Sequence, residues 1–380
     1  MLSATNWPLR LERRTQPSIP MQIASPLIAA AATLLTGFVL FGMLGKSPQA
    51  AFSVFFIEPV ASLYGVSELL LKATPLMLCA VGLAIGFRAN VWNIGAEGQF
   101  IVGALAGGGV ALFVPGLGSF ALPCMLVAGV MGGMAWAAIA ALLRTRFNAS
   151  EILVTLMLVY IARLLLSYCV HGPWRDPAGF NFPQSAAFAE TQLLPLLFAG
   201  TRLNAAFLLA LAFTALAWFF VSWTFAGYRM RVAGLAPAAA AYAGYSEKRN
   251  IWLALLISGG AAGLAGISEV AGPIGLLSPE ISPGYGFAAI IVAFVGRLHP
   301  PGIALASLLM SLLYLGGEAA QIEMQLPAAI TALFQGVLLF YLLAADLFIS
   351  FRLVRARRGT SPAALALDVE GAASVQSRAR

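Results

Sequence analysis

Charged side chains are scarce in this chain. Of its 380 residues only 10% are Asp, Glu, Lys or Arg, while 60% are hydrophobic. A soluble domain carries about 25% charged residues, so a soluble domain of useful size is excluded. The composition predicts an all-α polytopic membrane protein. The net charge of +7 does not indicate nucleic-acid binding, because the basic residues gather at the ends of apolar segments.

The chain is also poor in residues that build disulfides, metal sites and catalytic centres. It has three cysteines and two histidines. Cys79 and Cys124 fall inside apolar segments and Cys169 near the end of one, so no disulfide framework is expected. His171 and His299 are far apart in the sequence and indicate no metal site or triad. We therefore expect no enzyme and no cofactor.

A nucleotide-binding loop is missing as well. Gly45-Lys46-Ser47 resembles the end of a P-loop, but Leu40 stands where the first glycine of that motif is needed. Since no other candidate exists, we do not expect this chain to hydrolyse ATP.

Long hydrophobic runs are what the chain does have. A bilayer crossing needs about 20 apolar residues, and the runs predict about ten spans, of which 285–296 is short for a full crossing. They are 23–44, 66–86, 99–114, 119–143, 151–170, 204–223, 251–271, 285–296, 301–316 and 327–350. This leaves an N-terminal tail at 1–22, a transmembrane domain at 23–350 and a basic tail at 351–380. The first run is expected to be a retained span, because no convincing cleavage site follows it.

The distribution of basic residues supports this count. With the N-terminus inside, most arginines and lysines outside the spans fall on the inner side, as expected of cytoplasmic segments. These are Arg10, Arg13, Arg14, Arg88, Arg144, Arg146, Arg229, Arg231, Lys248, Arg249, Arg297, Arg352, Arg355, Arg357, Arg358, Arg378 and Arg380. Only Lys46, Arg175 and Arg202 fall outside. Both termini are therefore expected to be cytoplasmic.

Two segments interrupt the apolar pattern at matching places. Residues 87–100 read FRANVWNIGAEGQF, and residues 272–284 read GPIGLLSPEISPG. Each follows the first span of a set of four, and the two sets start on opposite sides, so a repeat would be inverted. Such interruptions in inverted halves are typical of transporters with a substrate site inside the membrane. The alternative stays open that loops between spans are simply rich in Gly and Pro.

Polar and aromatic residues at these breaks are candidates for a substrate pathway. Amides and carboxylates can hydrogen-bond sugar hydroxyls and base edges, and an indole can stack on a ring. The candidates are Asn90, Trp92, Asn93, Glu97, Gln99, Tyr285 and Phe287. The alternative is that they cap broken helix ends. Arg163 and Glu269 lie within spans, and because buried charges usually pair, a contact between them is considered.

The longest inner segment between spans, 226–250, is a candidate docking loop. Pro237 can start a short helix and Gly244 can end it. Small residues and an exposed aromatic such as Tyr242 suit insertion into a groove on another protein. We single out Arg231, Gly234, Pro237, Tyr242 and Gly244. The alternative is a loop held only by solvent and lipid headgroups.

Ordered sequence blocks resemble a known family. VGLAIGFRANVWNIGAEGQF at 81–100, NASEILVTLMLVYIA at 148–162, residues 228–244 and GYGFAAIIVAFVGRLHPPG at 284–302 are similar to blocks of ATP-binding-cassette (ABC) importer permeases of the branched-chain amino acid and simple-sugar superfamily. The larger nucleoside-type permease is the most similar. The resemblance covers about 66–345. Trp92, Pro237-Ala238 and Ala288 depart from the usual residues of the family, which leaves the substrate open.

The resemblance implies a ten-helix permease with an inverted repeat and a broken second helix, in a bacterial inner membrane. It implies nucleoside transport by alternating access, a separate ATPase docking on residues 226–250, a second permease subunit forming a heterodimer, and an extracytoplasmic substrate-binding lipoprotein. Two alternatives remain: a simple-sugar importer permease, and an ion-coupled secondary transporter acting alone. The latter would not need the docking loop.

Overall fold

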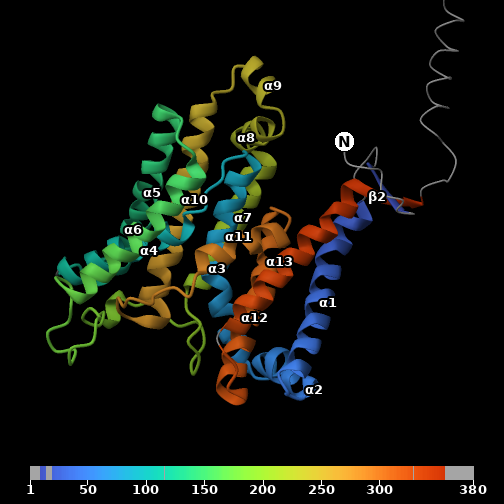
Figure 1. Cartoon of the computed structure of the whole chain (residues 1–380). Coiled ribbons are helices and arrows are strands. Elements are labelled where there is room, and N and C mark those ends of the chain that lie inside the picture. The colour runs from blue at the N-terminus through green and yellow to red at the C-terminus, as the bar shows by residue number, and fades with distance from the viewer. Residues whose placement is uncertain (1–8, 14–18, 115, 328, 356–380) are drawn as a thin grey trace, which may run out of the picture. The chain divides into compact units, whose positions relative to one another are not determined.

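The computed structural model describes residues 9–13, 19–114, 116–327 and 329–355, and these are mainly helical (Figure 1). The helices are α1 (Ile19–Met43), α2 (Pro48–Phe52), α3 (Leu63–Arg88), α4 (Ala96–Phe113), α5 (Ala121–Phe147), α6 (Glu151–His171), α7 (Ala206–Trp223), α8 (Phe225–Leu235), α9 (Pro237–Tyr242), α10 (Glu247–Glu269), α11 (Tyr285–Val295), α12 (Pro300–Met324) and α13 (Ala329–Ser350). Short π or 3-10 turns are Ser53–Ile57, Glu58–Val60, Gly118–Phe120, Glu190–Gln192 and Val270–Ile274, and the strands are β1 (Leu9–Arg13) and β2 (Phe351–Arg355).

The chain divides into two compact units, one of residues 36–337 and one of residues 1–35 with 338–380. In the second unit β1 pairs antiparallel with β2, and Arg352 binds Glu12 at 2.8 Å. The sequence analysis treated both segments as tails and did not predict this pairing. Because paired strands lie side by side, the β1–β2 pairing places residues 9–13 and 351–355 on the same side of a bilayer. Much of the predicted tails, including Arg14, Arg357, Arg358, Arg378 and Arg380, lies outside the described residues.

The predicted spans are largely confirmed. Within the described ranges, nine helices are long and apolar enough to cross a membrane, and the predicted segment 285–296 is the short apolar helix α11. The prediction for 301–316 was too short, because α12 continues to Met324. Glu318, expected in an outer loop, therefore lies in a helix, where its carboxylate binds Lys72 Nζ at 2.8 Å.

In the larger unit, α10 packs against α3, α4 and α5. Small residues allow the close approach. Gly263 of α10 meets Gly103 of α4, and a Cβ atom added to Gly263 would lie 3.0 Å from the Cα of Gly133 in α5. Because lipid offers no hydrophobic driving force between helices, such backbone contact through small residues is a main source of cohesion.

Both expected breaks are present. Residues 89–95 separate α3 from α4, and residues 275–284 separate the end of the α10 segment from α11. Ala89 beyond the end of α3 and Asn250 at the start of α10 line one pocket, so these two long helices run in opposite directions. Each half thus contains a long helix, a non-helical stretch and a shorter helix, in opposite orientations.

The connection between α6 and α7 covers the second break. Ser185 exchanges hydrogen bonds with Leu277: its backbone N–H donates to the Leu277 carbonyl at 2.9 Å, and its hydroxyl accepts from the Leu277 N–H at 2.9 Å. The Phe188 N–H donates to the Gly275 carbonyl at 2.8 Å. The connection is tied to α3 as well, because Arg202 Nε donates to Glu68 Oε1 at 3.0 Å. The Glu68 carboxylate raises the pKa of Arg202.

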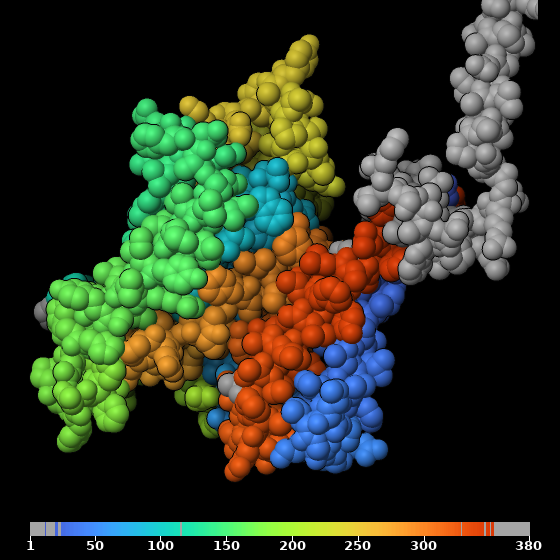
Figure 2. All heavy atoms as spheres, in the orientation of Figure 1, coloured from blue at the N-terminus to red at the C-terminus, as the bar shows by residue number. Residues whose placement is uncertain are grey.

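The opposite end of the larger unit carries α8 and α9, and we call it the α9 end. Figure 2 shows this segment in yellow, projecting at the upper edge of the view. The first break, which begins beside Arg88, opens toward the same end, because Ala89 and Asn90 line pockets together with residues of α8 and α9.

Candidate translocation site

Glu97 joins the two broken segments. It lies in the first turn of α4 with its side chain 1% exposed. Its Oε2 accepts a hydrogen bond of 2.8 Å from the backbone N–H of Gly286, in the first turn of α11. The N-termini of two helices therefore face one carboxylate, and both helix dipoles favour its negative charge. The fit is close, since a Cβ atom on Gly286 would meet the backbone of Glu97.

Arg163 of α6 supplies a positive charge beside this junction. Its NH2 atom lies 3.5 Å from Glu97 Oε1, and its guanidinium lies 5.7 Å from the ring centre of Phe287. The considered contact between Arg163 and Glu269 is therefore wrong. Glu269 ends α10 among the side chains of Thr74, Asn204 and Ser268. While Glu97 is buried, the Arg163 side chain is 48% exposed.

Asn93 and Gln99 form a closed hydrogen-bond network. Asn93 Nδ2 donates to Gln99 Oε1 and to Ser258 Oγ of α10, each at 2.8 Å. Asn93 Oδ1 accepts from Gln99 Nε2 at 3.1 Å and from the Gly95 N–H at 2.9 Å. Both amide side chains are 1% exposed. The amides therefore lock residues 93–99 to α10, and in this conformation their polar atoms face one another.

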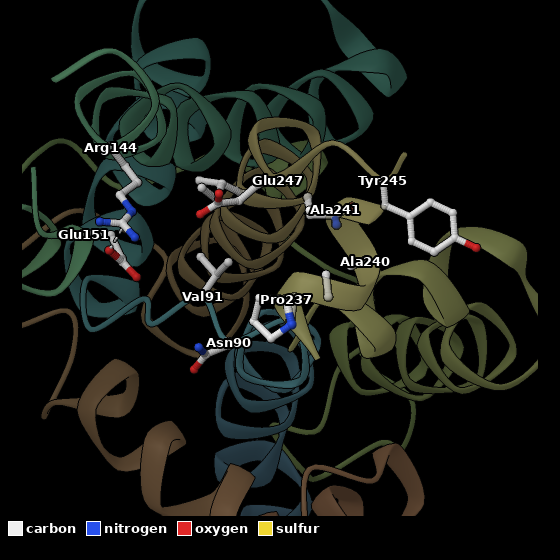
Figure 3. Close-up of a pocket in the computed structure, with 13 residues that line it drawn as sticks. Asn90, Val91, Arg144, Glu151, Pro237, Ala240, Ala241, Tyr245 and Glu247 are labelled. Carbon is white, nitrogen blue, oxygen red and sulfur yellow. Dashed lines mark ion pairs between the residues drawn. The ribbon is translucent and has the colours of Figure 1, made fainter. Parts of the chain in front are cut away.

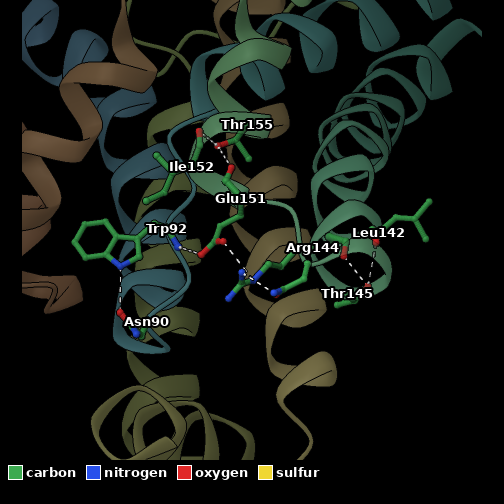
Figure 4. A network of polar contacts seen from close by, with 10 residues as sticks. Asn90, Trp92, Leu142, Arg144, Thr145, Glu151, Ile152 and Thr155 are labelled. Atoms are coloured by element: carbon green, nitrogen blue, oxygen red, sulfur yellow. Dashed lines mark hydrogen bonds and ion pairs between the residues drawn. The ribbon is translucent and has the colours of Figure 1, made fainter.

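Asn90 and Trp92 lie nearer the α9 end. Asn90 has a left-handed backbone, with φ of 57°, and its Oδ1 accepts from Trp92 Nε1 at 3.1 Å. The indole stacks on Phe294, with ring centres 6.0 Å apart, and contacts Phe87. Figure 4 shows Trp92 and Asn90 on one side of the segment between α3 and α4, with Glu151 and Arg144 on the other.

An ion pair between α5 and α6 lies beside residues 92–94 of the first break. The Trp92 N–H lies 3.5 Å from Glu151 Oε1, and Glu151 Oε2 lies 3.4 Å from Arg144 Nε (Figure 4). The Ile94 N–H donates to Thr155 Oγ1 at 3.2 Å. The start of α6 thus satisfies backbone donors that the break leaves without helical partners.

Tyr285 and Phe287 begin α11 beside Glu97. Tyr285 is buried and packs edge-on against Tyr314 of α12, with ring centres 5.6 Å apart. Its ring also contacts Phe100 of α4 in a tilted arrangement. Phe287 is half-buried below the Arg163 guanidinium. Among the pathway candidates, Glu97, Tyr285 and Phe287 thus meet at one junction. Sequence reasoning missed Ser258, whose only signal was a hydroxyl in an apolar helix.

The docking-loop candidates lie together at the α9 end. The expected short helix is α9, which begins at Pro237, and Gly244 follows it with φ of 78°. Tyr242 is 98% exposed. Arg231 and Gly234 lie on α8, where Gly234 packs directly against the carbonyl of Arg88.

A cavity of about 130 Å³ lies beneath α9. Figure 3 shows Pro237, Ala240 and Ala241 on one side of it, Arg144 and Glu151 on another, and Asn90 and Val91 below. Residues of α9 and residues 89–91 of the first break therefore line the same cavity.

Comparison with known proteins decides the family. The family model described as the permease component of branched-chain amino acid transport systems matches residues 65–343. The chain belongs to this family. The permease is 34% identical to a glucose ABC transporter permease of Haloferax volcanii, covering 90% of this chain and 92% of that protein. It is 29% identical to a guanosine ABC transporter permease of Bacillus subtilis, covering 83% and 91%, and 27% identical to a nucleoside ABC transporter permease of Lactococcus lactis, covering 78% and 84%.

The Asn93 network leads to a prediction about stability. Asn93→Ala removes the partners of Gln99, Ser258 and the Gly95 N–H, and each buried polar group left unsatisfied costs about 1–3 kcal/mol. We expect a clearly lower unfolding midpoint for the purified permease in detergent. Gln49→Ala, at an exposed position of α2, is the control and should leave the midpoint unchanged. Equal midpoints for both variants would contradict the structural role of the network.

Proposed function

We propose that this permease is a membrane subunit of an ATP-driven importer and forms part of the pathway for nucleosides or sugars. The observation that carries the proposal is the junction at Glu97, where two oppositely oriented broken segments meet in a chain of the permease family. Broken helices in inverted halves are the arrangement in which transporters bind solutes inside the membrane. Relatives named for glucose, guanosine and nucleosides support a polyhydroxylated solute.

The proposed pathway residues have two kinds of role. Glu97, Asn93, Gln99 and Tyr285 are buried and act as positioning residues, holding the two breaks together. The solute contacts are proposed for the accessible groups at the same breaks, which are Arg163, Phe287, Asn90 and Trp92. A guanidinium and an amide can hydrogen-bond hydroxyls, and the aromatic rings offer stacking surfaces to a sugar or a base.

Further subunits complete the proposal. A separate ATPase would dock on residues 226–250, where α9 presents Tyr242 to solvent and adjoins the first break. A second permease subunit, in a heterodimer, would cover the exposed face of α6 beside Arg163, because a half-exposed arginine within a span is costly against lipid. A substrate-binding lipoprotein would deliver the solute from outside. The α9 end and both termini would then face the cytoplasm of a bacterial inner membrane.

Reconstitution tests this function. The permease, its partner permease and the ATPase are placed in liposomes together with the binding lipoprotein, and uptake of a labelled nucleoside and of glucose is followed. We expect accumulation that requires ATP and the ATPase and is insensitive to proton or sodium gradients. Uptake by this chain alone, driven by an ion gradient, would instead show a secondary transporter and would contradict the proposal.

Replacing Gly244 tests the docking role of α9. A valine at a left-handed position is strained by roughly 1–2 kcal/mol, so Gly244→Val should redirect the chain after α9. We expect ATP hydrolysis to be uncoupled from uptake: substrate should no longer stimulate hydrolysis and uptake should fall, with the permease still in the membrane. Gly336→Val, at a glycine with open space around its Cα, is the control. Unchanged substrate-stimulated hydrolysis in Gly244→Val would count against the assignment.

A further inference from the structure

A second, larger cavity opens at the α9 end beside the first break. It has a volume of about 660 Å³. Its walls come from the end of α3, the end of α7, α8 and the turn between α11 and α12. The residues that line it are Phe87, Arg88, Asn90, Val221, Ser222, Tyr228, Arg231, Gly234, Leu235, Arg297, Leu298 and His299. We call it the basic pocket.

The charges in the basic pocket have one sign. It is lined by three arginines and a histidine, and no Asp or Glu is among its lining residues in the described part of the chain. The arginines come from three different elements, so the fold, and not a run of sequence, brings them together. The Arg88 guanidinium is held in place, because its Nε donates to the Leu298 carbonyl at 2.8 Å.

Like charges inside the pocket affect one another. Burial, and after it the positive charge of Arg88, lower the pKa of His299 from its ordinary value of 6.5. A group of cations that disfavour each other gains free energy when a multivalent anion binds between them. A phosphate group fits this role, since guanidinium groups bind phosphate oxygens through paired hydrogen bonds.

The rim of the basic pocket has the character of a membrane surface. Tyr228 and Leu235 of α8, which line the pocket, are 57% and 77% exposed. Phe225, whose ring stacks on Tyr228, and Trp223, which follows the lining residue Ser222 in the sequence, are 66% and 74% exposed. Trp and Tyr are enriched where acyl chains meet headgroups, so these side chains place the mouth of the pocket at the level of lipid phosphates.

We propose that the basic pocket binds the phosphate headgroup of an anionic membrane lipid. Basic pockets between transmembrane helices recognise such headgroups, and the exposed apolar rim would contact the start of the acyl chains. The bound phosphate would bridge α3, α8 and the α11–α12 turn.

Lipid titration of the full-length permease tests the proposal. Short-chain phosphatidylglycerol or phosphatidylcholine is added to the purified chain in neutral detergent, without other subunits, and bound lipid is counted by native mass spectrometry. We expect a clear preference for phosphatidylglycerol. Arg231→Glu should weaken phosphatidylglycerol binding by about fivefold or more for each unit of charge changed. The reason is that each basic residue near an anionic lipid surface contributes about 1 kcal/mol to binding.

The matched control is Lys248→Glu. Lys248 is exposed at the start of α10, at the same end of the unit but outside the basic pocket, and the charge change is identical. It should leave binding within about twofold, because exposed charges away from the site are screened. Equal losses in the two variants, or no preference for phosphatidylglycerol in the unmodified chain, would overturn the proposal.

The histidine provides a direct probe of the pocket. The chain has two histidines, so His171→Gln leaves His299 as the single imidazole in a proton NMR titration. A bound anion stabilises the imidazolium form, so phosphatidylglycerol should raise the pKa of His299 and phosphatidylcholine should not. If inorganic phosphate alone raised it equally, the site would be one for a soluble anion and the lipid proposal would be wrong.

Discussion

One buried carboxylate is the constraint on which the junction of the two broken segments depends. Glu97 lies in the first turn of α4 and accepts a hydrogen bond from the backbone N–H of Gly286 in α11, so the two broken segments meet at this carboxyl group. Two helix N-termini and the Arg163 guanidinium adjoin this buried carboxyl group and favour its charged form. The junction therefore fixes where the breaks meet, and it explains why the residue beside Glu97 on α11 is a glycine.

Around this junction the polar residues divide by burial. Asn93 hydrogen-bonds both Gln99 and Ser258 of α10, which holds the first break against α10. Arg163 and Phe287 keep accessible surface at the same place. In the proposed pathway the hydrogen-bond network would hold the break in position, and the accessible cation and ring would be available to a solute. At the α9 end the first break also adjoins α9, so the segment proposed to dock a partner borders the segment proposed to line the pathway.

Much of this was accessible from the sequence. Hydropathy and basic-residue placement predicted the spans, and interrupted patterns predicted the two breaks, because these features are local. The α9 helix between Pro237 and Gly244 was predicted for the same reason. The sequence did not predict which charged residues pair. A contact of Arg163 with Glu269 was considered, but Arg163 contacts Glu97, and the rule that buried charges pair does not select among several candidates. The pairing of β1 with β2, and the basic pocket, join segments distant in the sequence and left no local signal.

The accessibility of Phe287 tests most directly whether the two breaks enclose the pathway. A Phe287→Cys variant is prepared with Cys124 and Cys169 replaced and the fully buried Cys79 kept as an internal reference. The assembled, transport-competent complex is treated with a charged thiol reagent with and without the transported solute. The account predicts that Cys79 stays unlabelled, that position 287 reacts, and that solute slows this reaction. Labelling at 287 that is absent, or that solute does not change while uptake is intact, would contradict it.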